Sequence, residues 1–311
     1  MEYRRLGRSG LHVSLAGLGC NNFGMRIDYE AAEKVTNAAL DAGITLFDTA
    51  DVYGRGASEE MLGRALGARR HEVIIATKFA APMGEGPMHR GGSRHRIVEA
   101  CEASLRRLGT DYIDLYQMHM PDPDTPIEET LRALDDLVRS GKVRYLGNSN
   151  YKGWQIAEAH WTAETHHLTK MVSAQNHYNL MERAVEAEVV PACNHYGLGM
   201  LPYFPLASGF LTGKYRPGQG AAEGTRLAAW GDRAQGVLTD TNFETLEKLE
   251  AWAEERGHTV LDLAIGWLSS QSHVSSVISG ATKPEQLDAN AAAVDWVLTA
   301  EEVEEVAALV G

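Results

Sequence analysis

Short apolar runs alternate with amphipathic stretches along most of this 311-residue chain. Runs of this length predict buried strands, and the stretches between them have the spacing of surface helices. The predicted strands are residues 15–19, 44–47, 73–77, 112–117, 143–146, 171–175, 199–204 and 275–279. Strands that alternate with helices pair in parallel through right-handed crossovers, and eight such units close into a barrel. We therefore predict an α/β fold, a (β/α)8 TIM barrel that occupies residues 1–311 as one domain.

The main rival architecture is an open doubly wound sheet, which usually carries a glycine fingerprint after its first strand. The first predicted strand instead leads through Gly17, Gly19 and Cys20, without that fingerprint. Ahead of it, residues 3–7 and 11–14 predict a β-hairpin that plugs the N-terminal end of the barrel. The connections at 80–92 and 207–238 are long, and we expect both βα loops to border the C-terminal face, where barrel enzymes carry out chemistry.

The charge balance argues against two classes of partner. The chain has 29 Lys and Arg against 42 Asp and Glu, a net charge of −13, and no basic stripe that would neutralise phosphates. Neither nucleic acid nor a membrane is therefore an expected partner, and no apolar run predicts a membrane span or a secretory signal. Cys20, Cys101 and Cys193 lie far apart, which is typical of free thiols. We expect a cytoplasmic protein, and homo-oligomerisation stays open.

Four reactive side chains follow consecutive predicted strands. Asp48 and Tyr53 follow the second strand, Lys78 ends the third, and His119 follows the fourth. Singly, each has an ordinary explanation as a turn carboxylate, a loop aromatic, a surface lysine or a structural histidine. Together they are expected in one small space, because the C-terminal ends of barrel strands converge on one mouth. A lysine buried beside a carboxylate is costly, and such pairs concentrate at functional sites.

The motifs around these residues resemble those of the aldo-keto reductases, over nearly the whole chain. They are DTADVYG at 48–54, ATK at 76–78, DLYQMH at 114–119, GNSN at 147–150, GFLTGKY at 209–215 and GATKPEQL at 280–287. The resemblance implies an enzyme that reduces an aldehyde or ketone to the alcohol, by hydride transfer from a nicotinamide cofactor that is usually NADPH. The family's barrel agrees with the fold that the strand–helix alternation predicts independently.

The resemblance also implies a catalytic tetrad of Asp48, Tyr53, Lys78 and His119. Tyr53 would donate a proton to the carbonyl oxygen, and His119 would orient or polarise that oxygen. Lys78 would stabilise the phenolate, so that the pKa of Tyr53 is expected to fall, and Asp48 would hold Lys78 charged. The developing oxyanion then requires no metal.

A cofactor site is implied at the later strand ends. Ser149, Asn150 and Gln175 would bind the carboxamide, and Tyr203 would stack on the nicotinamide ring. Further implied contacts are Leu206, Ser208, Lys214, Arg226, Gly280, Thr282, Lys283, Gln286 and Asn290.

The segment at 282–284 bears on the choice between NADP and NAD. Pro284 suits the first turn of a helix, and a helix N-terminus beside Lys283 suits a phosphate, which favours NADP. The chain departs from the family pattern at Ala289, where many members carry Glu, and at Asn148, where a small apolar residue is common.

The sequence does not specify the substrate. Its pocket is expected among Asn21, Phe23, Met25, Pro82, Met83, Trp154 and Trp230, each of which is explained equally well as a packing residue. Aromatic and methionine side chains favour a partly apolar carbonyl compound. Two alternatives to a reductase stay open. One is a nicotinamide-binding regulatory or sensor subunit with little turnover, and the other is a barrel without redox chemistry.

Overall fold

The computed structural model describes residues 1–221, 223–229 and 231–310. Eight parallel strands form one sheet in the order β10-β3-β4-β5-β6-β7-β8-β9. Their bounds are β3 Ala16–Gly19, β4 Leu46–Asp48, β5 Ile74–Phe79, β6 Ile113–Met118, β7 Val143–Ser149, β8 Met171–Gln175, β9 Gly199–Met200 and β10 Val277–Gly280. Parallel bridges from Met200 to Val274 and from Tyr203 to Ile278 join the two edges. The predicted (β/α)8 barrel is therefore confirmed.

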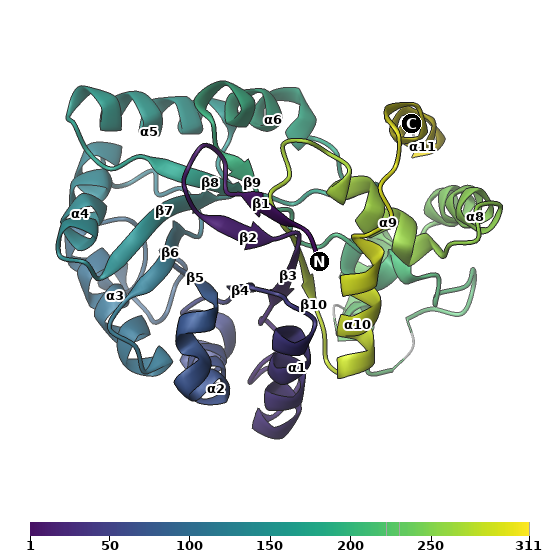
Figure 1. The fold of residues 1–311 in the computed structure, drawn as a ribbon, viewed down its shortest axis with the longest axis horizontal. Coiled ribbons are helices and arrows are strands. Elements are labelled where there is room, and N and C mark those ends of the chain that lie inside the picture. Colours follow the sequence, from purple (N-terminus) through teal and green to yellow (C-terminus); the bar gives the residue numbers. More distant parts are fainter. Residues whose placement is uncertain (222, 230, 311) are drawn as a thin grey trace.

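Helices surround the barrel, as Figure 1 shows. Those that follow strands β3 to β8 are α1 Tyr29–Asp41, α2 Ala57–Leu66, α3 Arg94–Leu108, α4 Ile127–Arg139, α5 Gly153–Thr165 and α6 Val185–Tyr196. The later helices are α7 Arg226–Ala229, α8 Asp240–Glu254, α9 Val260–Ser269, α10 Pro284–Ala293 and α11 Ala300–Val310. Several begin at side-chain caps: Asp28, Ser93 and Thr259 each accept a backbone N–H from the first turn, which satisfies an otherwise unpaired donor.

An N-terminal hairpin closes one end of the barrel. Strands β1 (Tyr3–Arg5) and β2 (His12–Ser14) pair antiparallel, and Figure 1 shows them crossing the barrel end that faces the viewer. Leu6 and Val13 are fully buried, in a small core cluster with Leu46, Ala76, Leu115 and Ile278 from the strands and Leu201 just after β9. Gly7 has φ +58°, and a Cβ there would lie 2.4 Å from the carbonyl oxygen of Gly197. The hairpin is the predicted plug.

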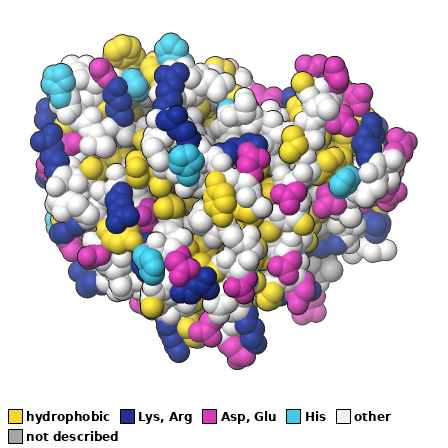
Figure 2. Space-filling model, viewed as in Figure 1, with side chains coloured by type: hydrophobic (Ala, Val, Ile, Leu, Met, Phe, Trp, Pro, Cys, Tyr) yellow, Lys and Arg dark blue, Asp and Glu magenta, His cyan; other side chains and the backbone are white. Residues whose placement is uncertain are grey.

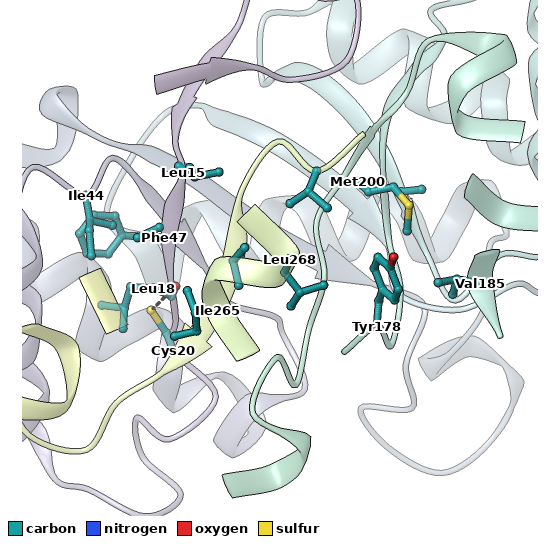
Figure 3. Packing of buried hydrophobic residues seen from close by; sticks show 14 of the residues in the cluster. Leu15, Leu18, Cys20, Ile44, Phe47, Tyr178, Val185, Met200, Ile265 and Leu268 are labelled. Carbon is teal, nitrogen blue, oxygen red and sulfur yellow. Dashed lines mark hydrogen bonds between the residues drawn. The ribbon is translucent and has the colours of Figure 1, made fainter. Parts of the chain in front are cut away.

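The main core lies between the strands and the surrounding helices. Figure 3 shows Leu18 and Phe47 of the strands in this cluster, together with Ile265 and Leu268 of α9. One strand is shorter than predicted: regular pairing of β9 ends at Met200 instead of reaching residue 204. Pro202 offers no N–H to continue a ladder, so only isolated bridges follow it.

The surface agrees with the acidic composition. Figure 2 shows acidic side chains gathered at the right-hand edge, where α8 and α11 lie, while Lys and Arg are scattered over the rest of that face. Within the described part of the chain, no helix is long and apolar enough to span a membrane, and no group of His, Cys, Asp and Glu could hold a metal ion. All three cysteines are free and buried.

Candidate active site

The four residues of the expected tetrad lie together at the C-terminal ends of β4, β5 and β6. Lys78 Nζ donates to Asp48 Oδ2 at 2.6 Å and to the backbone oxygen of Thr49 at 2.9 Å. The same Nζ lies 3.4 Å from the hydroxyl oxygen of Tyr53. The rings of Tyr53 and His119 meet edge to face, with centroids 5.8 Å apart. The four side chains are thus in successive contact, from the carboxylate of Asp48 through Lys78 and Tyr53 to the imidazole of His119.

Lys78 is completely buried and is held in its charged form. Burial alone disfavours an ammonium, but the carboxylate of Asp48 and the oxygen of Tyr53 outweigh it, so the pKa of Lys78 is raised above its usual value. Lys78 therefore carries a fixed positive charge beside the phenol at neutral pH.

The pKa of Tyr53 differs from the expectation drawn from the sequence. Burial of the phenol raises this pKa above its ordinary value, and the opposing effect of Lys78 is smaller. The predicted fall in the pKa of Tyr53 is therefore wrong, because removing the phenolate from water destabilises it more than the nearby ammonium stabilises it. Tyr53 is consequently protonated at neutral pH, as a proton donor must be.

His119 is neutral in this setting. Burial, together with the charge of Lys78, lowers the pKa of its imidazole to about 3. A neutral imidazole has one ring N–H to donate and one nitrogen that accepts. His119 is thus suited to hydrogen bonding rather than to acting as an acid at neutral pH.

Two glutamines complete the surroundings of Asp48. Gln175 Nε2 donates to Asp48 Oδ1 at 2.7 Å, and Gln117 Nε2 donates to the same oxygen at 3.3 Å. Gln175 was expected to bind a carboxamide, and here its amide N–H is already engaged by Asp48. Gln117 was missed, although strand alternation signals it: it is two residues before His119 on β6 and so shares the inward face.

A cavity of about 900 Å³ opens above this group. Asp48, Tyr53 and His119 line it, whereas Lys78 is buried behind them. Its wall also includes every residue expected to bind the cofactor: Ser149, Asn150, Gln175, Tyr203, Leu206, Ser208, Lys214, Arg226, Gly280, Thr282, Lys283, Gln286 and Asn290. The structure therefore brings the two expected sets of residues into one space.

The loop after β9 holds unusual backbone geometry on this wall. Phe204, Ala207 and Ser208 all have positive φ, at 54°, 45° and 60°. Non-glycine residues in this region are strained, and such strain clusters at ligand sites. The hydroxyl of Tyr203, just before this stretch, donates to Asn150 Oδ1 at 2.8 Å and so orders the aromatic ring.

Three cations meet on the cavity wall beside this loop, where Arg226 lies 5.0 Å from the ring centre of Phe204. Arg226 Nη2 donates to Asn21 Oδ1 and Asn22 Oδ1, and Arg26 Nη2 donates to the carbonyl oxygen of Gly224. Burial and the neighbouring arginines lower the pKa of Lys214. Among the described residues no acidic side chain pairs with any of the three. Sequence reasoning missed Arg26, because nothing in the loop after β3 indicates which of its side chains turns inward.

The residues expected around the substrate are scattered. Asn21 lines the cavity, but Phe23 does not: it is fully buried in the main core, so that expectation is wrong. Its N–H donates to the carbonyl oxygen of Cys20, which turns the loop and its ring inward. Outside the cavity wall stand Met25, Pro82, Met83 and Trp154, of which Met25 and Trp154 are well exposed. Trp230 lies outside the described residues.

The two departures from the family pattern have definite places. Asn148 is fully buried on β7 and donates to the carbonyl oxygen of Ser173 on β8. It follows directly on the shift in pairing register between Leu146 and Gly147, so it bridges the two strands where their ladder is irregular. Ala289 lies on the cavity wall, near Gln286 and Asn290.

Comparisons with known proteins agree with this geometry. The model of the Aldo/keto reductase family matches residues 16–310. The chain is 41% identical over 318 residues to a probable voltage-gated potassium channel subunit beta of Oryza sativa subsp. japonica, with 100% of this chain and 97% of that protein covered.

Two bacterial relatives have names that refer to redox chemistry. The uncharacterized oxidoreductase YrpG of Bacillus subtilis is 39% identical over 312 residues, with 97% of this chain and 93% of that protein covered. The L-glyceraldehyde 3-phosphate reductase of Escherichia coli O157:H7 is 36% identical over 309 residues, with 95% and 88% covered. The chain belongs to the aldo/keto reductase family of oxidoreductases.

Proposed function

We propose that this oxidoreductase uses NADPH to reduce an aldehyde or ketone to the alcohol, with Tyr53 as the proton donor. The observation that carries the proposal is the half-buried phenol of Tyr53, 3.4 Å from the ammonium of Lys78, on the wall of a large cavity. The bacterial relatives named as an oxidoreductase and as an L-glyceraldehyde 3-phosphate reductase support the same class of reaction.

The cavity fits a nicotinamide dinucleotide. Gly280 leaves a cradle at the end of β10, because a Cβ there would lie 3.2 Å from Asn22 Nδ2 and 3.3 Å from Asn21 Oδ1. Arg26, Lys214 and Arg226 form no ion pair within the described part of the chain, and their charges suit phosphate groups, which arginine and lysine bind strongly. When bound, NADPH supplies the hydride that reduces the carbonyl carbon.

The remaining cofactor contacts follow from the same wall. Ser149 and Asn150 would hold the carboxamide, and Tyr203, with its hydroxyl anchored on Asn150, would present its ring to the nicotinamide. Lys283 and Thr282 at the N-terminus of α10 would receive a 2′-phosphate, which supports NADPH over NADH.

The chain's own groups explain how the proton reaches the substrate. Tyr53 is protonated at neutral pH and donates its proton to the carbonyl oxygen. Lys78, kept charged by Asp48, stabilises the resulting phenolate. Neutral His119 donates a ring N–H to the same oxygen and so stabilises the charge that develops on it.

A carbonyl screen tests the proposal. NADPH absorbance is followed with a panel of aldehydes and ketones, including phosphorylated short-chain aldehydes, and the panel is repeated with NADH. We expect steady turnover with at least one carbonyl compound and a higher kcat/KM for NADPH than for NADH. Tight binding of NADPH without turnover of any carbonyl compound would contradict a reductase.

A second function is favoured by one observation. The relatives of Oryza sativa and Arabidopsis thaliana, at 41% and 39% identity, are both named as probable potassium channel beta subunits. By this reading the protein binds a nicotinamide cofactor chiefly to regulate a partner. A single turnover followed by slow release of the oxidised cofactor would favour it, whereas rapid multiple turnover favours the enzyme.

A further inference from the structure

The turn that carries Tyr53 is tied to the helix layer behind the barrel wall. On β5, Lys78 reaches the inside of the barrel, while the neighbouring Thr77 donates to Glu59 of α2 at 2.6 Å. In this outer layer two ion pairs with buried carboxylates join α3 to the turn after β4 and to α2. They are Arg96 with Asp51, at 2.7 Å, and Arg107 with Glu59, at 2.7 Å.

Asp51 connects both central residues of the site. It lies in the short turn between Asp48 and Tyr53, and its backbone N–H donates to the carbonyl oxygen of Lys78 at 3.2 Å. Its carboxylate accepts from Arg96 Nη2, and Arg96 is in the first turn of α3. This side-chain pair therefore ties the turn that carries the phenol to α3, and a hydrogen bond between the hydroxyls of Thr49 and Ser58 ties the start of the same turn to α2.

This pair is poorly suited to being a stabilising device. Asp51 and Arg96 are both almost completely buried, and burial raises the pKa of Asp51 to about 7 although Arg96 opposes this. Glu59 and Arg107 are the other charged groups that act on the Asp51 carboxyl. Among the described residues, Asp51 Oδ1, Arg96 Nε and the nearby hydroxyl of Tyr116 have no hydrogen-bond partner. Apolar residues of similar size are often at least as stable in such a place.

We propose that Asp51 and Arg96 form a positioning pair that holds the hydroxyl of Tyr53 in place beside Lys78. Neither residue lines the cavity, so the pair acts through the turn and touches neither substrate nor cofactor. Its catalytic consequence rests on the proposed function, whereas its effect on the order of the turn does not.

The test compares two matched double variants. Asp51→Asn with Arg96→Gln removes the charges of the positioning pair while leaving groups that can still hydrogen-bond. The control is Asp114→Asn with Arg70→Gln, because Arg70 and Asp114 form another largely buried pair, also 2.7 Å apart, near the opposite end of the barrel, where Asp114 also pairs with Arg144 at 3.2 Å. For both variants the measurements are kcat and KM with a carbonyl substrate, the Kd of NADP⁺, Tm, and amide hydrogen exchange of residues 49–56.

We expect the positioning variant to lose about 10- to 100-fold in kcat, since small misplacements of a reacting group have effects of this size. Its KM and Kd stay within about 3-fold of wild type, its Tm falls no more than that of the control, and exchange in residues 49–56 accelerates. The control keeps wild-type kcat and exchange in that segment. The single variant Asp51→Asn replaces the double variant if the latter does not fold.

Unchanged exchange in residues 49–56 overturns the proposal, whatever the activity. A fall in kcat that the control shows equally also overturns it, because the effect would then be one of general stability. If wild type reduces no carbonyl compound, the proposed function fails, and the exchange measurement alone decides whether the pair holds the turn.

Discussion

Near its N-terminal end the barrel is filled by apolar side chains, whereas two residues further along the same strands it holds charges and amides. The pairs are Leu46 and Asp48 on β4, Ala76 and Lys78 on β5, and Leu115 and Gln117 on β6. Each pair shares the inward face, because side chains alternate along a strand. The hairpin seals the apolar end, and the cavity opens above the polar one.

The same strands thus contribute stability at their N-terminal ends and reactive groups at their C-terminal ends. The apolar end buries Leu6, Val13 and Leu115 completely, which stabilises the closed barrel. The polar end contains a lysine and a carboxylate out of water, an arrangement that costs free energy unless it is fully hydrogen-bonded. Substitutions at the two ends should therefore have effects of different kinds.

Lys78→Met should have the largest effect on activity. It removes the cation beside the Tyr53 hydroxyl, so kcat should fall by about 10²- to 10⁴-fold, the range typical of groups that assist proton transfer. NADP⁺ binding, followed by quenching of protein fluorescence, should change little because Lys78 does not line the cavity. Retained activity would show that the charge on Lys78 is not needed.

Leu115→Ala should act only on stability. It leaves a cavity in the sealed end and should lower the free energy of unfolding by about 2–5 kcal/mol. Denaturant unfolding measures this loss, and kcat at a temperature where the variant is folded should stay within about 2-fold of wild type. A large fall in kcat would mean that the two ends are coupled.

Gly7→Ala tests the seal itself. The new Cβ would meet the backbone of Gly197 and Gly199, and the positive φ at residue 7 is unfavourable for alanine. We expect a loss of about 1–3 kcal/mol in unfolding free energy. Gly10→Ala in the same hairpin is the matched control, because a Cβ there meets nothing within 4 Å. Equal effects of the two substitutions would contradict tight seating of the hairpin.

His119→Gln should give the smallest of these effects on stability, seen as a change in the acid dependence of Tm. The folded protein resists protonation of His119, whose pKa is about 3, while the unfolded chain takes up that proton below about pH 6.5. Wild type therefore loses stability from this group as pH falls below about 6.5. The variant should show a smaller decrease in Tm between about pH 7 and pH 5, whereas a matched substitution of the exposed His71 should not.

The sequence alone predicts the framework and the convergence of reactive groups. The eight strands follow from apolar periodicity, and the positions of Asp48, Lys78 and His119 follow from the rule that strand ends share one mouth. Loop side chains were harder to predict, because no periodicity fixes their direction: Phe23 turned into the core, and Arg26 turned into the cavity. The direction of the pKa shift of Tyr53 was mispredicted because it depends on the balance between burial and a nearby charge, which is known only once the fold is known.

The most direct test of the central claim is isotope transfer in wild type and in Tyr53→Phe. NADPH carrying deuterium at the transferable position of its nicotinamide is mixed with a carbonyl substrate, and the alcohol is analysed by mass spectrometry. We predict deuterium on the former carbonyl carbon with wild type, and at least about 10²-fold slower formation of that product with Tyr53→Phe, which should bind NADPH as tightly as wild type. Near-normal product formation by Tyr53→Phe would contradict the assignment of its phenol as the proton donor, and an unlabelled alcohol would contradict hydride transfer in this cavity.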